Sequence, residues 1–334
     1  RRLDHMNTDI YIGNATPPNE EGFVSLSLSN VYEKRMIENA KIVILEINPK
    51  LPRTFGDLQV HIDDIDYMID VDYDIPELPD GELTEKDIKI GNYIADLIND
   101  GDCLQLGIGG IPNAVASALV HKRDLGVHTE MFTTGFMKLY KAGAISGKFK
   151  NTHPGKMVAC FALGTRELYD FIDNNPLVEI LDGHYVNNPA VIGLNDNQVS
   201  INSTIEIDIT GQCCSESIGH MQFSGTGGQV DTATGAQISK GGRSFIALYS
   251  TAMVRNPKTG EREEVSKIVP FLKPGAVVSL SRNDIDHVVT EYGVVHLSGT
   301  TIKERVELLI SIAHPKFREE LMSEAVKYGL HPGL

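Results

Sequence analysis

The chain has 334 residues, which is enough for two domains rather than one of average size. Its formal net charge of −15 argues against nucleic-acid binding, because that requires clustered Lys and Arg. No stretch approaches the roughly 20 apolar residues that a membrane span needs, and the opening residues lack the apolar run of a signal peptide. These features predict a soluble, cytoplasmic protein with no membrane or nucleic-acid partner.

Predicted strands alternate with predicted helices along most of the chain, which indicates an α/β fold with largely parallel sheets. An amphipathic pattern predicts a helix near residues 31–39, and a β-branched run predicts a strand at 41–47. The stretch 73–83 has two prolines, four acidic residues and no apolar period, which is typical of a linker. We therefore expect three segments: a first domain at 1–76, a linker at 77–83 and a second domain at 84–334.

The second domain opens with a helix, which a β-α-β pattern follows. Thr84 can cap a helix, with Asp87 in the reciprocal capping position. The pattern then predicts, in chain order, a strand at 103–106, a tight turn at 107–110, a helix at 111–120, a strand at 127–130 and a helix at 136–141. Beyond these it predicts a strand at 157–163, a helix at 165–174, a region rich in strands and turns at 177–250, and helices at 301–313 and 315–328.

The first candidate site is the turn between a strand and a helix at Leu106–Pro112. Glycine lets the backbone turn sharply and lets a ligand approach it closely. The start of the following helix offers unpaired N–H groups to a phosphate or an oxyanion. The turn is neither a Walker A loop nor a dinucleotide fingerprint, because the required Gly-Lys-Ser/Thr and third glycine are missing. Taken alone, it can also be purely structural.

Glu130 ends the strand that follows this turn and its helix. Consecutive strands of a right-handed β-α-β unit run parallel and often side by side, and open α/β sheets bind ligands at the carboxyl ends of their strands. We therefore expect Glu130 to lie beside the turn at Gly107–Gly110. Considered without other information, a glutamate at a strand end is more often a solvated surface residue.

Two later motifs are also candidates. Ser224–Asp231 has three glycines in four residues, which fits either a nest of backbone amides that holds an anion or a flexible loop. Glu291 follows a strand-like run at 286–290 and is a second candidate acid, although packing and hydrogen bonding would also account for it.

The cysteines and histidines form no metal-site pattern. The four cysteines include no Cys-x-x-Cys pair, so we expect free buried thiols. His128, His287 and His314 are not spaced as a ligand pair, and we expect them to be structural. No metal is predicted.

Taken together, these segments resemble the acetyl-CoA hydrolase/transferase family, and most of all its 4-hydroxybutyrate and butyryl-CoA:acetate CoA-transferase branch. The resemblance is specific because the matching stretches keep their order over nearly the whole chain. They are 16–23, 104–115, 125–131, 224–231, 266–270, 288–293 and 312–315.

The resemblance implies two α/β domains of the CoA-transferase (NagB/RpiA-like) fold, with mostly parallel sheets and an active site between the domains. It places the family's catalytic glutamate on Glu130. It places the CoA-binding positions on Gly107, Ile108, Gly109, Gly110, Ile111, Gly225, Gly227 and Gly228. Coenzyme A is then a substrate, and acyl-CoA and small carboxylic acids are the partners.

The function that the resemblance implies is transfer of CoA between a short-chain acyl-CoA and a carboxylate such as acetate, through a glutamyl-CoA thioester. An acyl-CoA hydrolase and an inactive CoA-binding subunit are the alternatives. Family members carry a further N-terminal segment, so we expect an incomplete first domain. Either the chain is truncated or processed, or another chain supplies that part. A homo-oligomer is expected, as is common for such enzymes.

Overall fold

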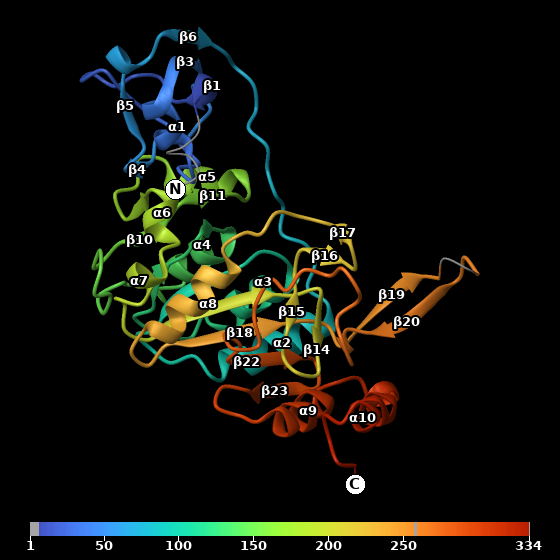
Figure 1. The fold of residues 1–334 in the computed structure, drawn as a ribbon. Coiled ribbons are helices and arrows are strands. Elements are labelled where there is room, and N and C mark those ends of the chain that lie inside the picture. The colour runs from blue at the N-terminus through green and yellow to red at the C-terminus, as the bar shows by residue number, and fades with distance from the viewer. Residues whose placement is uncertain (1–6, 257–258, 334) are drawn as a thin grey trace.

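The computed structural model describes residues 7–256 and 259–333 (Figure 1). Its centre is a nine-stranded sheet in which every neighbouring pair is parallel except the last two strands at one edge. From that edge to the other, the strands are β23 (Gly293–His296), β22 (His287–Thr290), β18 (Arg243–Ala247), β13 (Gln198–Ser203), β7 (Cys103–Leu106), β8 (Gly126–His128), β10 (Met157–Ala159), β12 (Val178–Ile180) and β4 (Phe55–Gly56). The predicted α/β class with mostly parallel sheets is confirmed.

Helices pack against this sheet and against one another. Helices α2 and α3 pack together, and α7 packs with α8, which also contacts β13 and β18 (Figure 1). The helices of this part are α2 (Glu85–Ala95), α3 (Gly110–Ala118), α4 (Thr134–Lys141), α5 (Arg166–Ile172), α6 (Gly183–Val186), α7 (Pro189–Ile192), α8 (Gln229–Ile238), α9 (Ile302–Ser311), a 3₁₀ turn η3 (Pro315–Phe317) and α10 (Arg318–Lys327).

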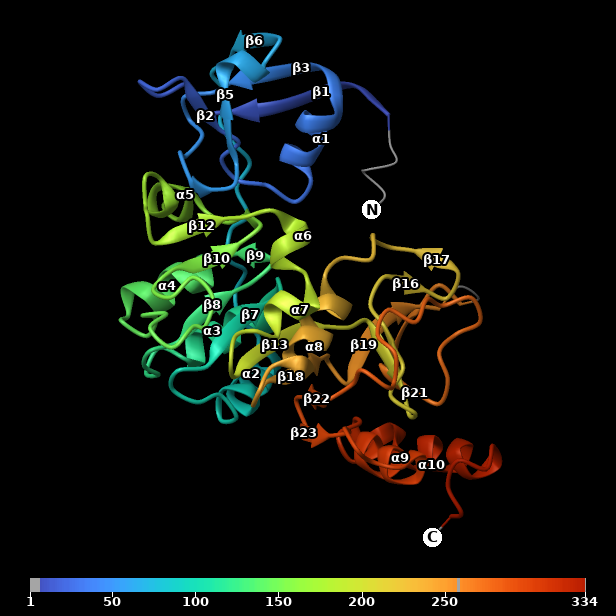
Figure 2. The ribbon, with the colours of Figure 1, turned by 60° about the vertical axis from the view of Figure 1, so that its left-hand side comes forward.

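The N-terminal elements form a smaller unit at one end of the molecule, with the C-terminal helices at the other end (Figure 2). A parallel three-stranded sheet has the order β1-β3-β6, and two further strands pair antiparallel. No helix or strand occurs at residues 71–84, which run from this unit to α2. The elements are β1 (Thr8–Ala15), β2 (Phe23–Ser25), α1 (Glu33–Asn39), β3 (Ala40–Ile47), β5 (Gln59–His61), η2 (Ile62–Asp64) and β6 (Tyr67–Asp70).

Short strands complete the fold beside the main sheet. They are β9 (Met131–Phe132), β11 (Phe161–Ala162), β14 (Glu206–Asp208), β15 (Cys213–Cys214), β16 (Ser217–Ile218), β17 (Met221–Gln222), β19 (Thr251–Arg255), β20 (Arg262–Ser266) and β21 (Ile268–Val269).

Local sequence signals account for the elements around the candidate site. All four residues of β7 are buried, as expected for an inner strand of a parallel sheet. Helix α2 begins with the predicted reciprocal cap, in which the Thr84 hydroxyl accepts from the Asp87 N–H at 3.2 Å and Asp87 accepts from the Thr84 N–H at 2.8 Å. Pro112 lies in the first turn of α3, where no intrahelical N–H partner is required.

Helix α8 is the main element that the sequence analysis missed. Its Thr-, Ala- and Gly-rich sequence lacks a strong apolar stripe, so it suggested only strands and turns. Its small residues serve close packing instead: a Cβ on Gly235 would lie 2.6 Å from the Ile192 side chain of α7. The helix starts at Gln229, so the motif at 224–231 is a loop followed by a helix start rather than loop throughout.

Two predictions from composition can be compared with the structure. All four cysteines are free and buried, as expected. Among the described residues, no helix combines the length and the apolar character that crossing a bilayer would require.

Candidate active site

A cavity of about 370 Å³ opens at the carboxyl ends of the central strands. Strands β7 and β8 are adjacent and parallel, so the residues that follow them emerge at the same edge of the sheet. Gly107 directly follows β7, and Glu130 lies two residues beyond the end of β8. Both line the cavity, together with Ile108 and the loop at 224–229.

The main chain and the side chain of Glu130 are both held in place. Its carbonyl oxygen accepts hydrogen bonds from the N–H groups of Cys160 and Phe161, at 3.0 and 3.2 Å. Its half-buried carboxylate accepts hydrogen bonds from the side-chain amide of Asn187 and from the backbone N–H of Gly228. The carboxylate is therefore fixed against the start of α8.

Only a glycine fits at position 228 beside this carboxylate. A Cβ there would lie 2.2 Å from Oε2 of Glu130 and 2.7 Å from Nδ2 of Asn187. Real Cβ contacts are far longer, so any side chain at this position would displace the carboxylate or the helix start. The close approach also brings the positive end of the α8 dipole to Glu130.

The surroundings raise the pKa of Glu130 above its ordinary value. Burial is the main cause, because it disfavours the charged form, and the negative charge of Asp231 in the first turn of α8 adds to it. The hydrogen bonds from Asn187 and Gly228 act in the opposite direction but do not cancel the effect of burial.

The second glycine motif faces the cavity with little obstruction. Gly225 and Gly227 both line it, and a Cβ on either would meet no atom within 4 Å. Gly227 has a φ of +64°, in the left-handed region that favours glycine. The backbone of this loop is therefore open to a ligand in the cavity.

The residues of the first glycine motif, Gly107–Ile111, lie in three different environments. Gly107 and Ile108 line the Glu130 cavity. Gly109 and Gly110 line a neighbouring cavity of about 210 Å³, which Ile108 also lines. The side chain of Ile111 is buried in the core, so only its backbone N–H in the first turn of α3 is suited to binding a ligand.

A network of polar side chains beside the cavity was not identified from the sequence. Oε1 of Gln105 accepts from the Ser200 hydroxyl at 2.8 Å, and the Asn202 amide donates to the hydroxyls of Ser200 and Thr232, both at 3.0 Å. Gln105 and Asn202 line the cavity. The usable signal was a polar residue within the apolar strand β7 and polar residues at alternate positions of the largely buried strand β13. Asn187 gave no such signal, because it lies in a loop far from Glu130 in sequence.

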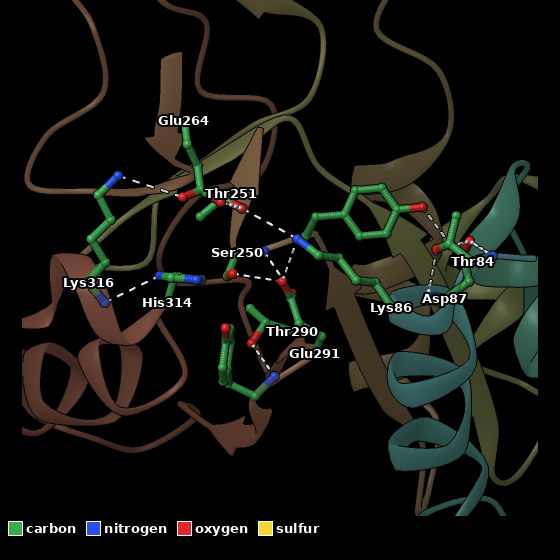
Figure 3. Close-up of polar contacts among 12 residues, drawn as sticks. Thr84, Lys86, Asp87, Ser250, Thr251, Glu264, Thr290, Glu291, His314 and Lys316 are labelled. Carbon is green, nitrogen blue, oxygen red and sulfur yellow. Dashed lines mark hydrogen bonds and ion pairs between the residues drawn. The ribbon is translucent and has the colours of Figure 1, made fainter. Parts of the chain in front are cut away.

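Glu291, the second candidate acid, lies in a separate network (Figure 3). Its carboxylate accepts from the N–H and the hydroxyl of Ser250, at 2.9 and 2.8 Å, and forms an ion pair with Lys86 at 3.0 Å. Although burial alone would raise the pKa of Glu291, these partners lower it below its ordinary value. Glu291 thus joins α2 to the ends of β18 and β22, and it is not among the described residues that line the Glu130 cavity.

Two of the three predicted structural histidines have structural partners. Nε2 of the buried His128 lies 2.9 Å from the Val186 carbonyl oxygen. His314 packs edge-on against Tyr292, and its Nδ1 accepts from the Lys316 N–H at 3.3 Å (Figure 3). The third, His287, has a different environment that is described below.

Comparisons with known proteins give a consistent result. A model of the acetyl-CoA hydrolase/transferase N-terminal domain matches residues 2–77, and one of the corresponding C-terminal domain matches 164–325. A 4-hydroxybutyrate coenzyme A transferase of Clostridium kluyveri is 50% identical over 96% of this chain and 73% of that protein. A butyryl-CoA:acetate CoA-transferase of Anaerostipes caccae is 39% identical over 97% and 73%.

Solved structures of similar proteins have the same fold as this chain. The crystal structure of a 4-hydroxybutyrate CoA-transferase from Porphyromonas gingivalis has a TM-score of 0.84 and 43% identity, covering 98% of this chain and 77% of that one. RipA from Yersinia pestis has a TM-score of 0.91 and 37% identity, covering 98% and 72%.

Proposed function

Because the chain belongs to the acetyl-CoA hydrolase/transferase family, as its motifs predicted, we propose that it exchanges CoA between a short-chain acyl-CoA and a carboxylate such as acetate, with Glu130 as the nucleophile. One observation carries the proposal: the half-buried Glu130 carboxylate lies in a cavity lined by both glycine motifs and accepts a hydrogen bond from the Gly228 amide. The CoA-transferase relatives support the reaction type.

The proposed reaction proceeds through covalent intermediates on Glu130. The carboxylate attacks the thioester carbonyl, the CoA thiolate leaves, and a mixed anhydride forms between Glu130 and the acyl group. The thiolate then attacks the Glu130 carbonyl, which releases the first carboxylate and leaves a glutamyl-CoA thioester. The acceptor carboxylate reverses these steps. The energy of the thioester is conserved on the enzyme, so no other energy source is needed.

Backbone amides supply the main stabilisation of charge in this scheme. The tetrahedral intermediates carry an oxyanion beside Glu130, where amides of the loop at Gly225–Gly228, which lines the cavity, would donate to it. A single donor of this kind is typically worth about 10²–10³-fold in rate. Gly107, Ile108, Gly109 and Gly110, with the backbone of Ile111, would bind the CoA moiety at the start of α3.

Product analysis separates the transferase from its two alternatives. Incubation with butyryl-CoA and isotopically labelled acetate should yield labelled acetyl-CoA and butyrate, with parallel lines in a ping-pong analysis. A hydrolase would release free CoA thiol whether or not acetate is present. An inactive CoA-binding subunit would give neither product.

The raised pKa of Glu130 predicts a shifted acid limb in the pH profile of kcat/KM. The nucleophile must be ionised, so activity should fall as the pH drops through this pKa, and it should fall at a higher pH than for an ordinary glutamate. Asp231→Asn removes a charge that raises this pKa, and should move the limb to lower pH. Asp70→Asn, at the exposed end of β6, should leave the limb in place. Identical acid limbs in all three proteins would contradict this electrostatic account.

Several further features are proposed on the basis of the family resemblance. We propose a cytoplasmic homo-oligomer that acts on acyl-CoA and small carboxylic acids and uses no metal in the transfer chemistry. The division into segments 1–76, 77–83 and 84–334 also stays a prediction.

A further inference from the structure

Three side chains that bind metals well in proteins meet where β22 begins and β23 ends. His287 and His296 are directly opposite each other in this antiparallel pair. Nδ1 of His287 lies 3.0 Å from Oδ2 of Asp286, and Nε2 of His296 lies 3.0 Å from Oδ1 of the same carboxylate. The three ligand atoms all lie within 4.8 Å of one another.

Nδ1 of His287 is one of the buried side-chain atoms that lack a hydrogen bond within residues 7–256 and 259–333. It nevertheless faces the Asp286 carboxylate. The His287 ring is held by stacking on Phe245, with ring centroids 4.8 Å apart. A buried nitrogen of this kind costs free energy unless something binds it.

Asp286 is fixed in place and available as a ligand. Its Oδ2 accepts the Ser244 N–H at 2.9 Å, and its carbonyl oxygen accepts the Leu297 N–H at 2.7 Å. The carboxylate is therefore held where both imidazole rings reach it.

The cluster lies at the amino end of the parallel strand β22, whereas Glu130 lies at the carboxyl ends of the parallel strands. Strands β22, β18, β13, β7 and β8 are all parallel. Glu130 follows the carboxyl end of β8, whereas His287 is the first residue of β22. A ligand bound to the cluster would therefore not touch the reacting atoms.

We propose that Asp286, His287 and His296 form a binding site for a divalent transition-metal ion, with Zn²⁺ as the best fit. Two imidazole nitrogens and one carboxylate oxygen are the usual ligand types of zinc, which takes bonds of about 2.0–2.2 Å. Small side-chain adjustments bring ligand atoms at the observed spacing to such bonds. The side chain of His296 is 57% exposed, so the metal has an entry path and water can complete the tetrahedron.

The role of the ion would be to fasten the β22–β23 hairpin at its open end. That hairpin is the edge of the main sheet and leads directly to α9. A metal that binds only the folded chain stabilises it in proportion to the logarithm of its concentration over Kd.

Zinc titration of the full chain, freed of purification tags and stripped with a chelator, tests the proposal. With a chromophoric competitor at pH 7.5, we expect one equivalent of Zn²⁺ per chain and a rise in Tm of a few degrees. His296→Asn removes an exposed ligand, so the fold should persist. Loss of even a supporting partner weakens metal binding by about 10–100-fold, so loss of this direct ligand should weaken it by at least about 100-fold.

Two further variants make the test specific. Asp286→Asn keeps an acceptor for the Ser244 N–H but removes the charge, and should also weaken zinc binding. His121→Asn, at an exposed histidine after α3, should bind zinc as the unmodified chain does. Absence of stoichiometric binding would overturn the proposal and leave plain Asp–His contacts. Equal zinc affinity in His296→Asn would overturn it too. A transfer rate that follows zinc content would refute the separation from the catalytic cavity.

Discussion

Glu130→Gln should abolish CoA transfer while leaving the protein folded. The variant keeps the shape of the side chain and an acceptor for the Gly228 N–H, but its amide cannot form the anhydride. Removing a catalytic nucleophile typically costs on the order of 10⁴–10⁶-fold in kcat. The measurement is the initial rate of acetyl-CoA formation from butyryl-CoA and acetate, with circular dichroism to verify the fold.

Stability distinguishes this loss from simple unfolding. The pKa of Glu130 is raised in the folded chain, so its ionised form is less favourable there than in the unfolded chain, and this holds at any pH above the folded pKa. Glu130→Gln should therefore keep or raise Tm at pH 7–8. Glu319→Gln, on the exposed surface of α10, is the matched control and should retain full transfer activity. A Glu130→Gln enzyme with more than a few per cent of the normal rate would rule out Glu130 as the nucleophile.

Gly228→Ala should produce the second-largest loss. The added methyl would lie 2.2 Å from Oε2 of Glu130, so either the carboxylate or the start of α8 must move. Displacement of a reacting group by about 1 Å can cost about 10²-fold, and loss of the amide donor can cost a similar factor. We expect kcat to fall by about 10²–10³-fold, as measured by steady-state kinetics with both substrates varied.

Gly225→Ala in the same loop separates displacement of Glu130 from crowding of the bound substrate. A Cβ at position 225 meets no protein atom within 4 Å, so Glu130 stays in place. Any effect of this variant should appear as a higher KM for acyl-CoA rather than a lower kcat. Equal losses of kcat in the two variants would show that the contact between Gly228 and Glu130 is not what matters.

The unit that holds the candidate nucleophile was predictable because its signals are local. A buried apolar strand, glycines, a proline suited to a first helical turn and a second strand follow one another within about thirty residues, and the handedness rule places both strand ends on one edge. The pairing of β7 with β8 agrees with this expectation. Predicted ranges for α1, α3 and the two C-terminal helices match the structure within a few residues, and α2 begins at the predicted cap.

The features that the sequence did not indicate depend on contacts between residues far apart in the chain. Asn187 and Gly228 reach Glu130 from segments 57 and 98 residues further along the chain, and no local sequence pattern indicates that these residues meet. Helix α8 was missed because its small residues are suited to close helix packing rather than to an amphipathic stripe. The sequence did not indicate that His287 and His296 meet, because only the register of a hairpin brings them opposite each other.

Mass spectrometry of the protein after incubation with acyl-CoA tests the central claim most directly. Borohydride reduces a glutamyl thioester to an alcohol. Digestion of the reduced protein should therefore yield a peptide in which Glu130 has become 5-hydroxynorvaline. Conversion of the carboxyl group to a primary alcohol lowers the mass of that peptide by about 14 Da. This modification should require acyl-CoA and should disappear when acetate is added before the borohydride. An active preparation in which the peptide with Glu130 stays unmodified, or in which another carboxylate is reduced instead, would contradict the account.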